Sequence, residues 1–463
     1  MEIKYIENGS VTSAKGFTAN GICAGVKASN TTKKDLALIY CDKVCNSAAI
    51  FTKNLVKSDT IYVTKKHLEN GTAQAVVVNS GNANACNPDG YEKAEKMCSL
   101  AADALGVDEN DVIVASTGVI GQPLPIEPIA SGIEKLKGTL SKDGGISAAE
   151  AIMTTDTVKK QWAVETVLDG KKVTIGGIAK GSGMIHINMG TTLSFVTTDA
   201  AISSEMLKSA LIEAADVSYN MVSVDGDTST NDTLAIMASG YAGNKEITEK
   251  NDDYKTFTAV LTDAFKKVAK KLAKDGEGAT KLLICKVDGA KDDKSAKIIS
   301  KSIICSSLVK AAMFGADANC GRILCAIGYS GAETDVKKID VSYKSAKGEI
   351  LVCKNGNGLV FDEDKAKEIL LEDEMGMRFA GIEGVVVHQE DEVRSELEKA
   401  VNRDDIAVIL ITETLVSLCP DLIYDLKLNR KQPLIVEIPD RHGNGRTKDS
   451  ITKYVQDAIG VKL

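Results

Sequence analysis

The spacing of apolar and polar positions changes along the chain, and these changes predict an order of strands and helices. Short apolar runs bounded by Gly, Asn and Asp predict strands between residues 16 and 63 and at 73–79, 112–115, 173–175, 191–198, 282–285, 339–341 and 350–352. Apolar residues that recur every three or four positions predict helices at 90–105, 123–151, 206–215, 254–273, 306–316 and 361–371. The first and larger part of the chain therefore mixes both element types.

The pattern becomes a compact alternation after about Asp373. Strands are expected at 385–387, 406–411 and 434–438, and helices at 392–401, 412–418 and 449–459. Regular alternation of strand and helix is typical of a small α/β module with a parallel sheet. We therefore expect one region over residues 1–373 and a second over 374–463.

The chain has 463 residues, 44% of them hydrophobic, which is enough for more than one ordinary core. Its net charge of −8 comes without a basic stripe, so nucleic acid is not expected as a partner. The N-terminal residues contain no apolar signal core, and no apolar run approaches the length of a membrane span. We expect no membrane insertion and a cytoplasmic location.

The number and spacing of the cysteines and histidines limit the kinds of catalytic or metal site that the chain can form. The eleven cysteines are scattered from Cys23 to Cys419 without a Cys-x-x-Cys pair, which gives poor support for a disulfide framework or a metal site. The four histidines are widely separated and lack the spacing of a zinc-binding helix. We expect neither a metal nor a cofactor, and a catalytic base other than histidine. An N-terminal amine exposed by backbone cleavage is one such base for threonine.

Residues 176–198 hold the most informative stretch. Five glycines surround Lys180, and the last of them, Gly190, precedes Thr191 and Thr192. A phosphate cradle is disfavoured because these glycines open a strand and not a helix. Two interpretations remain, a plain glycine-rich hairpin with a surface lysine or a nucleophilic Thr191, and the stretch alone favours the hairpin.

Three other polar stretches could carry chemistry, and each also fits an ordinary turn or loop. The sequence NSGNANAC at 79–86 fits an Asx-type turn and a polar pocket equally well. The sequence STGVIG at 116–121 places a hydroxyl beside a glycine N–H at a strand exit, a weak signal of an oxyanion hole. The sequence DGDTSTNDT at 225–233 fits a solvated or capping loop, and it slightly resembles calcium-binding spacing but lacks the distal glutamate of that pattern.

Taken in order, these motifs resemble one family. From about Lys15 to Leu371 the chain is similar to the bifunctional ornithine acetyltransferase and N-acetylglutamate synthase of arginine biosynthesis. The resemblance rests on seven ordered motifs, namely 79–86, 116–121, MTTDT at 153–157, KGSGMI at 180–185, 225–233, GRI at 321–323 and GYSG at 328–331. It implies a two-lobed α+β or α/β fold in which helices cover the sheets.

The resemblance also implies that the chain cleaves itself between Gly190 and Thr191, giving an α part of 1–190 and a β part of 191–373. The free amine of Thr191 then acts as the base, since an α-amine has an ordinary pKa of about 7.7–8.0. Thr191 Oγ takes the acetyl group from N2-acetylornithine and passes it to glutamate. Acetyl-CoA is a possible further donor, and an α2β2 heterotetramer is the expected assembly.

Each site residue follows from the same resemblance. Thr191 is the expected nucleophile, and Thr117 with Gly118 is expected to hold the oxyanion. Thr154, Lys180, Thr191 and Glu277 are the expected substrate contacts, with Lys180 a partner for the substrate's α-carboxylate.

The chain departs from the family at two places. His186-Ile187 replaces an expected Ala-Pro, and Gly190-Thr191-Thr192 replaces an expected Ala-Thr-Met. The family's closing segment has no counterpart after Leu371, so the acetyltransferase region is expected to be truncated at its C-terminal end.

Residues from about 375 to 463 resemble instead the F subunit of V-type ATPases, without its first strand. The resemblance rests on GIEGVVV at 381–387, IAVILITE at 406–413 and IPD at 438–440. Each of the two resembled proteins lacks a segment at the junction. An in-frame fusion or a joined gene model explains this. The alternative function is a catalytically impaired chimera that only binds as a stalk-type module, with ATPase stalk subunits as partners. A related self-cleaving aminopeptidase is a third interpretation, and the motif around Lys180 argues against it.

Overall fold

The computed structural model describes residues 3–186, 192–380, 389–403, 408–430 and 433–438. The chain forms two compact units, Met1–Gly381 and Ile382–Leu463. The division lies later than the boundary expected at Asp373, because β16 (Glu374–Ala380) pairs with β12 (Leu282–Asp288) and β13 (Asp340–Ser345) inside the first unit. Its ladder hydrogen bonds belong to the first unit's sheet.

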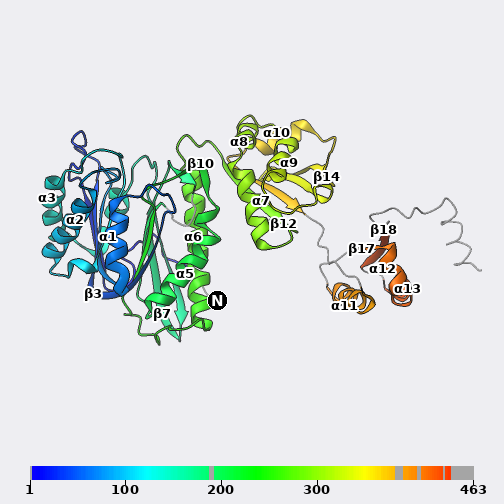
Figure 1. Cartoon of the computed structure of the whole chain (residues 1–463), viewed down its shortest axis with the longest axis horizontal. Coiled ribbons are helices and arrows are strands. Elements are labelled where there is room, and N and C mark those ends of the chain that lie inside the picture. The colour runs from blue at the N-terminus through cyan, green and yellow to red at the C-terminus, as the bar shows by residue number, and fades with distance from the viewer. Residues whose placement is uncertain (1–2, 187–191, 381–388, 404–407, 431–432, 439–463) are drawn as a thin grey trace, which may run out of the picture. The chain divides into compact units, whose positions relative to one another are not determined.

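A nine-stranded sheet is the centre of the first unit (Figure 1). Its order is β1 (Lys4–Tyr5), β6 (Lys160–Leu168), β7 (Lys171–Lys180), β9 (Leu193–Thr198), β11 (Thr233–Ala238), β3 (Leu36–Phe51), β4 (Thr72–Asn79) and β5 (Val112–Ser116), with β2 (Phe17–Ile22) paired to β3. The β9–β11 and β4–β5 pairs are parallel and the other pairs are antiparallel. Strands from both sides of the Gly190–Thr191 bond therefore share one sheet.

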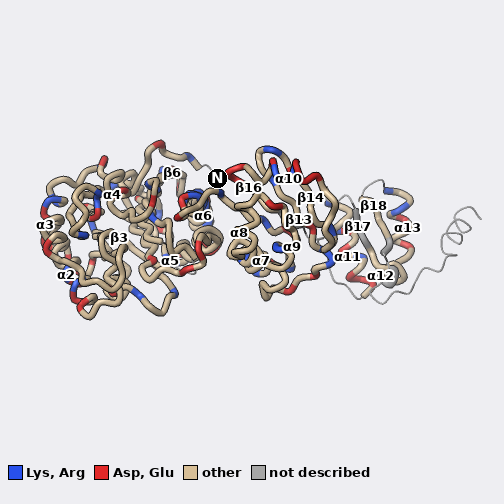
Figure 2. Tube along the Cα trace, turned by 90° about the horizontal axis from the view of Figure 1, so that it is seen from above, with Lys and Arg blue, Asp and Glu red and all other residues tan. Residues whose placement is uncertain are grey.

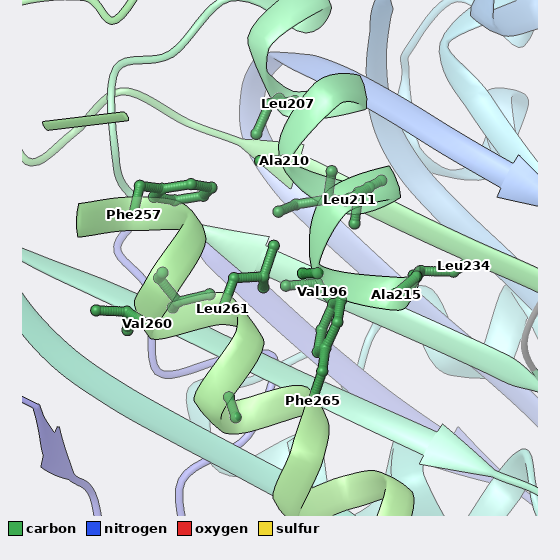
Figure 3. Packing of buried hydrophobic residues seen from close by; sticks show 14 of the residues in the cluster. Val196, Leu207, Ala210, Leu211, Ala215, Leu234, Phe257, Val260, Leu261 and Phe265 are labelled. Carbon is green, nitrogen blue, oxygen red and sulfur yellow. The ribbon is translucent and has the colours of Figure 1, made fainter. Parts of the chain in front are cut away.

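Helices α5 (Ser204–Asp216) and α6 (Asp252–Lys274) cover one face of this sheet (Figures 1 and 3). Figure 3 shows Leu211 of α5 and Phe265 of α6 packed beside Val196 of β9. Successive side chains of a strand point to opposite faces. On β11, Leu234 accordingly joins the core under α5 and α6, while Ala235 belongs to the core on the other face.

Four helices pack on the rest of the sheet, namely α1 (Asp59–His67), α2 (Gly90–Leu105), α3 (Ile126–Lys137) and α4 (Gly145–Ala151). The expectation of strand structure as far as Val63 is wrong at its end, because α1 begins at Asp59. Ile61, Thr64 and His67 are buried at helical spacing, and an acidic residue opens α1 while basic residues close it.

A five-stranded sheet forms the rest of the first unit, in the order β12, β16, β13, β14 (Gly348–Lys354) and β15 (Asn357–Gly358). It packs with α7 (Asp293–Cys305), α8 (Ser307–Phe314), α9 (Cys320–Gly328) and α10 (Glu363–Leu370) around its own apolar core. Sheets covered by helices confirm the expected mixed fold class, whereas α7 and β6 were not predicted from the sequence.

The second unit contains α11 (Glu390–Val401), β17 (Val408–Thr412), α12 (Glu413–Leu418), α13 (Pro420–Asn429) and β18 (Leu434–Ile438). Strands β17 and β18 are parallel, as expected for an α/β module. The strand expected at 385–387 and the helix expected at 449–459 lie outside the described residues.

Acidic and basic positions are interspersed along the surface helices of both units, as Figure 2 shows for α2, α3, α10 and α13. Within the described residues, no helix is both long enough and apolar enough to span a membrane.

Candidate active site

The strand β5 ends in a tight turn at Thr117 and Gly118. Thr117 is buried, and its backbone N–H donates to Asn79 O at 2.9 Å. Gly118 has a φ of +131°, and a Cβ at this position would lie 2.7 Å from Asn82 N and from Gly81 C. Only glycine fits both the backbone conformation and the close approach. The turn predicted at 116–121 is therefore locked against the turn at 79–86.

The asparagine side chains of residues 79–86 accept hydrogen bonds within their own turn and donate to neighbouring segments. Asn79 Oδ1 accepts from Gly81 N at 3.2 Å and from Asn82 N at 3.0 Å, and Asn79 Nδ2 donates to Ser116 Oγ at 2.7 Å. Asn82 Oδ1 accepts from Asn84 N at 2.7 Å. These are Asx-type contacts, so the structural interpretation of this stretch holds.

Lys180 is the last residue of β7 and lies next to Thr117. Its Nζ donates to Thr117 Oγ1 at 3.3 Å, although 63 residues separate them, and the lysine is 8% exposed. The plain hairpin with a surface lysine is therefore wrong. Burial lowers the pKa of Lys180 below its ordinary value, while the charges of Asp156 and Asp232 act in the opposite direction.

Asp156 connects the loop of Thr154 to the end of β7. Its Oδ1 accepts from Gly181 N at 2.7 Å, and its Oδ2 accepts from Thr154 N at 3.1 Å. Burial acts to raise the pKa of Asp156, but Lys180, Lys160 and these hydrogen bonds together hold it below its usual range. Thr154 is therefore fixed by its backbone close to Lys180.

Glu277 reaches the same glycine-rich segment from the loop after α6. Its backbone N–H donates to Ser182 O at 3.0 Å. A Cβ on Gly183 would collide with Glu277 Oε2, so the exposed carboxylate lies against this glycine. Four of the predicted site regions, at Thr117–Gly118, Thr154, Lys180 and Glu277, are thus joined through residues 180–183.

Gly190 and Thr191 lie outside the described residues. The chain is described again from Thr192, which is 5% exposed and whose Oγ1 has no hydrogen-bond partner among the described residues. Leu193 then pairs with Lys180 in the β7–β9 ladder. The last described residues before 187 form the strand β8 (Ile185–His186), which pairs with β10 (Ser223–Thr228).

The stretch DGDTSTNDT divides into an exposed and a buried half. Asp225 and Asp227 are exposed, whereas Asn231 and Asp232 are buried. Asn231 Nδ2 donates at 2.6 Å both to Ala83 O and to Ser116 O, so it joins the two turns of the site. The prediction of a solvated loop is therefore wrong for both halves, because the exposed half lies in the strand β10 (Ser223–Thr228) and the other half is buried.

Asp232 is a site residue that the sequence did not single out. Burial raises the pKa of its carboxyl to about 7, against the effects of a hydrogen bond with Ser229 and of the charge of Lys180. A buried acid with a raised pKa beside a buried lysine is typical of functional sites. The only available signal was the density of carboxylates in the motif.

No group of three or more potential metal ligands occurs among the described residues. The site thus consists of a hydroxyl, a constrained glycine, a buried ammonium and buried carboxylates around the two ends of the segment that carries Thr191. Such a set stabilises developing negative charge and binds a carboxylate, as acyl-transfer enzymes require.

Comparisons with known proteins give the family. The model of the ArgJ family matches residues 18–384, and a model described as ATP synthase (F/14-kDa) subunit matches residues 372–455. The chain therefore belongs to the ArgJ family and is an acetyltransferase of arginine biosynthesis, with an F-like module at its C-terminal end. The resemblance inferred from the ordered motifs is confirmed, and the two matches overlap at β16.

The curated relatives include two named arginine biosynthesis bifunctional protein ArgJ and ArgJ 1. The relative from Caldanaerobacter subterraneus subsp. tengcongensis is 50% identical over 371 residues, which cover 80% of this chain and 91% of the relative. The relative from Clostridium acetobutylicum is 50% identical over 369 residues, which cover 80% of this chain and 90% of the relative.

Two solved structures are also similar. The bifunctional protein argJ from Bacillus halodurans is 44% identical, with 41% of this chain and 98% of that chain covered and a TM-score of 0.38. Ornithine acetyltransferase from Mycobacterium tuberculosis, solved in complex with ornithine, is 34% identical, with 41% and 100% covered and a TM-score of 0.38.

Proposed function

We propose that the chain cleaves itself between Gly190 and Thr191 and then transfers an acetyl group from N2-acetylornithine to glutamate through an acetyl-threonine ester at Thr191. The two curated relatives, named bifunctional proteins of arginine biosynthesis and 50% identical to this chain, support this reaction. Cleavage consumes one water and leaves a carboxylate on Gly190 and a free amine on Thr191.

One observation carries the proposal, the hydrogen bond from Lys180 Nζ to Thr117 Oγ1. An ammonium can only donate, so the oxygen of Thr117 is the acceptor and its own proton remains available for another acceptor. A hydroxyl polarised in this way, next to the constrained Gly118, suits the oxyanion of a tetrahedral intermediate.

The described end of β9 lies beside the buried lysine, since Leu193 pairs with Lys180 in the β7–β9 ladder. We assign the nucleophile to Thr191, which precedes Leu193 by two residues in the sequence.

The reaction then proceeds in two half-reactions. Thr191 Oγ attacks the acetyl carbonyl carbon, and the α-amine of Thr191 takes the hydroxyl proton. The bond between the carbonyl carbon and the ornithine nitrogen breaks, and the proton passes to that leaving nitrogen. The α-amine of glutamate attacks the acetyl-threonine ester in the same way, which releases N-acetylglutamate and restores the threonine.

In this reaction Lys180 binds the substrate's α-carboxylate, while Thr154 and Glu277 contact the rest of the donor. The use of acetyl-CoA as a further donor and an α2β2 assembly of the cleaved chains belong to the same proposal. The F-like module is proposed to bind a partner of its own, as a stalk subunit would.

The test is an acetyl-transfer assay on the full chain, with N2-acetylornithine as donor and glutamate as acceptor. We expect N-acetylglutamate and ornithine to form in equal amounts. No transfer, with the chain intact on a denaturing gel, would contradict the proposal and favour the impaired chimera. Hydrolysis of peptide amides in place of transfer would instead favour an aminopeptidase.

A further inference from the structure

A cysteine and a histidine from distant segments of the first unit are in direct contact. Cys305 is the last residue of α7, and His186 is the last residue of β8. The Sγ of Cys305 lies 3.5 Å from Nδ1 of His186, although 119 residues separate the two in the sequence. A thiol is a weak donor and an imidazole nitrogen is an acceptor, so the thiol proton can point to the ring. The proposed acetyl transfer uses neither residue.

The imidazole of His186 is held in this position from the side of β10. His186 pairs with Ser223 in the β8–β10 ladder, and Thr228 Oγ1 donates to His186 O at 2.9 Å. The hydroxyl of Ser223 also contacts Nδ1, at 3.1 Å. A hydroxyl can donate or accept, so Ser223 can leave the lone pair of Nδ1 to the thiol proton and then accept from Nδ1–H. A nucleophile, a base and a group that orients the base therefore lie together.

The thiol is held in place by the helices that carry it. Lys301 Nζ of α7 donates to Asn220 O at 2.5 Å, and Lys310 Nζ of α8 donates to Val224 O at 2.5 Å, so both helices are fastened next to β10. Lys301 precedes Cys305 by four residues and shares its face of α7. Cationic groups near a sulfur stabilise negative charge that develops on it. The surroundings of the thiol therefore suit attack by its sulfur.

The imidazole is in the form that can accept a proton. Burial and the charges of Lys301 and Lys310 lower the pKa of His186 below its usual value, while Asp225 and Asp227 act in the opposite direction. The ring is therefore neutral at neutral pH, as a general base must be.

The contact is also open to small reactants. Cys305 and His186 are both half-buried, in contrast to Cys98 and Cys353, which are buried. Cys325 of α9 is exposed. In the part of the chain that the structure describes, Cys305 is the one cysteine with a hydrogen bond to a histidine. Exposure alone would favour reaction at Cys325, whereas the contact with a base favours Cys305.

We propose that Cys305 is a thiol modification site that reacts with small disulfides, with His186 as its base. The Sγ of Cys305 attacks one sulfur of the disulfide while Nδ1 of His186 takes the thiol proton. The S–S bond of the reactant breaks, and a new S–S bond joins Cys305 to one half of the reactant. The departing thiolate takes the proton from His186. One thiol and one disulfide thus give one mixed disulfide and one thiol, and the reactant itself is the oxidant.

The test follows the labelling of each cysteine in the folded full chain. The chain is incubated with hydroxyethyl disulfide, a small neutral disulfide, and the mixed disulfides are quantified over time by peptide mass spectrometry. Cys305 should react at least about tenfold faster than the more exposed Cys325, since a positioned base accelerates the attack. In the urea-denatured chain the two cysteines should react at similar rates, because the contact with His186 is lost.

A variant then isolates the base. His186→Gln keeps a polar side chain that cannot take the proton, so the rate at Cys305 should fall at least about tenfold, while the rate at Cys325 in the same sample stays unchanged. His67→Gln is the matched control, because the ring of His67 contacts Val112 O at 2.9 Å and its loss should leave the rate at Cys305 unchanged. Cys305→Ser identifies the labelled peptide.

A rate at Cys305 equal to or below that at Cys325 in the folded unmodified chain would overturn the proposal, and this comparison needs no variant. An unchanged rate at Cys305 in His186→Gln would overturn it as well. Neither measurement uses acetyl transfer, so the result is independent of the proposed function.

Discussion

Two clusters in this chain each pair one cation with two carboxylates, and they differ in their surroundings. Lys160 in the first unit contacts Asp156 and Asp275 with no exposure of its side chain. Arg394 in the second unit donates to Glu390 and Asp421 at 2.9 Å, with side-chain exposures of 36%, 55% and 69%. Exposed pairs contribute about 0–1 kcal/mol, whereas breaking a buried pair leaves an uncompensated charge in the core.

The same contrast extends to the two units. In the first unit, buried polar residues such as Asp156, Lys180 and Asp232 gather where β7, β11 and the turn after β5 meet. The described core of the second unit consists of apolar residues from α11, β17, α12, α13 and β18. The first unit therefore tolerates the cost of buried charge at a site, while the second is packed as a simple module.

Replacing Lys160 is expected to have the largest effect on the free energy of unfolding, and it tests the contrast between buried and exposed ion pairs. Lys160→Met leaves Asp156 and Asp275 buried without their cation, and we expect the free energy of unfolding to fall by about 3–5 kcal/mol. Calorimetry of the full chain checks this. The control is Lys159→Met, since Lys159 is 43% exposed and contacts Glu150 at 3.2 Å. An equal effect in both variants would show that burial does not distinguish them.

Removing the hydroxyl of Thr117 tests the chemistry of the first unit. Thr117→Val keeps the shape but loses the donor for the oxyanion, so kcat should fall about 10²–10³-fold, or about 2.7–4 kcal/mol in the barrier. Steady-state transfer kinetics measure the loss. Thr117→Ser keeps the hydroxyl and should retain most of the activity, and a Thr117→Val enzyme with full kcat would remove this residue from the mechanism.

The raised pKa of Asp232, about 7, predicts a dependence of stability on pH. Between pH 4 and 7 the folded chain holds a proton that the unfolded chain has released, so the free energy of unfolding falls as pH rises through this window. Asp232→Asn does not ionise and should be more stable than the unmodified chain by about 1–3 kcal/mol at pH 8, with a smaller difference at pH 5. The exposed Asp227 gives the control, because Asp227→Asn should change stability little at either pH.

The smallest effect is expected in the second unit. Arg394→Ala removes an exposed cation and should change the free energy of unfolding by less than about 1 kcal/mol, and it should leave acetyl transfer unaltered. Urea denaturation and the transfer assay measure both. A large loss of transfer would mean that the second unit takes part in the reaction, contrary to the comparison.

Local patterns in the sequence predicted much of the fold and part of the site. The apolar spacing identified α2, α5 and α6, because each buries one face against a sheet. The ordered motifs identified Thr117, Lys180 and Thr154, which the structure brings together around residues 180–183.

Contacts between residues that are far apart in the sequence could not be predicted from it. Asp275 lies 115 residues from Lys160, and no period or spacing indicates that the two meet. Asp232 was assigned to a solvated loop because Asp225 and Asp227 share its motif and only burial separates it from them. The start of α1 at Asp59 was missed because its short run of β-branched residues suggests a strand.

The most direct test of the account is the intact mass of the purified full chain under denaturing conditions, before and after incubation with N2-acetylornithine. We predict two fragments, the second beginning at Thr191, and a gain of one acetyl group on that second fragment that disappears when glutamate is added. A single full-length mass, or an acetyl group on a residue other than Thr191, would contradict the account.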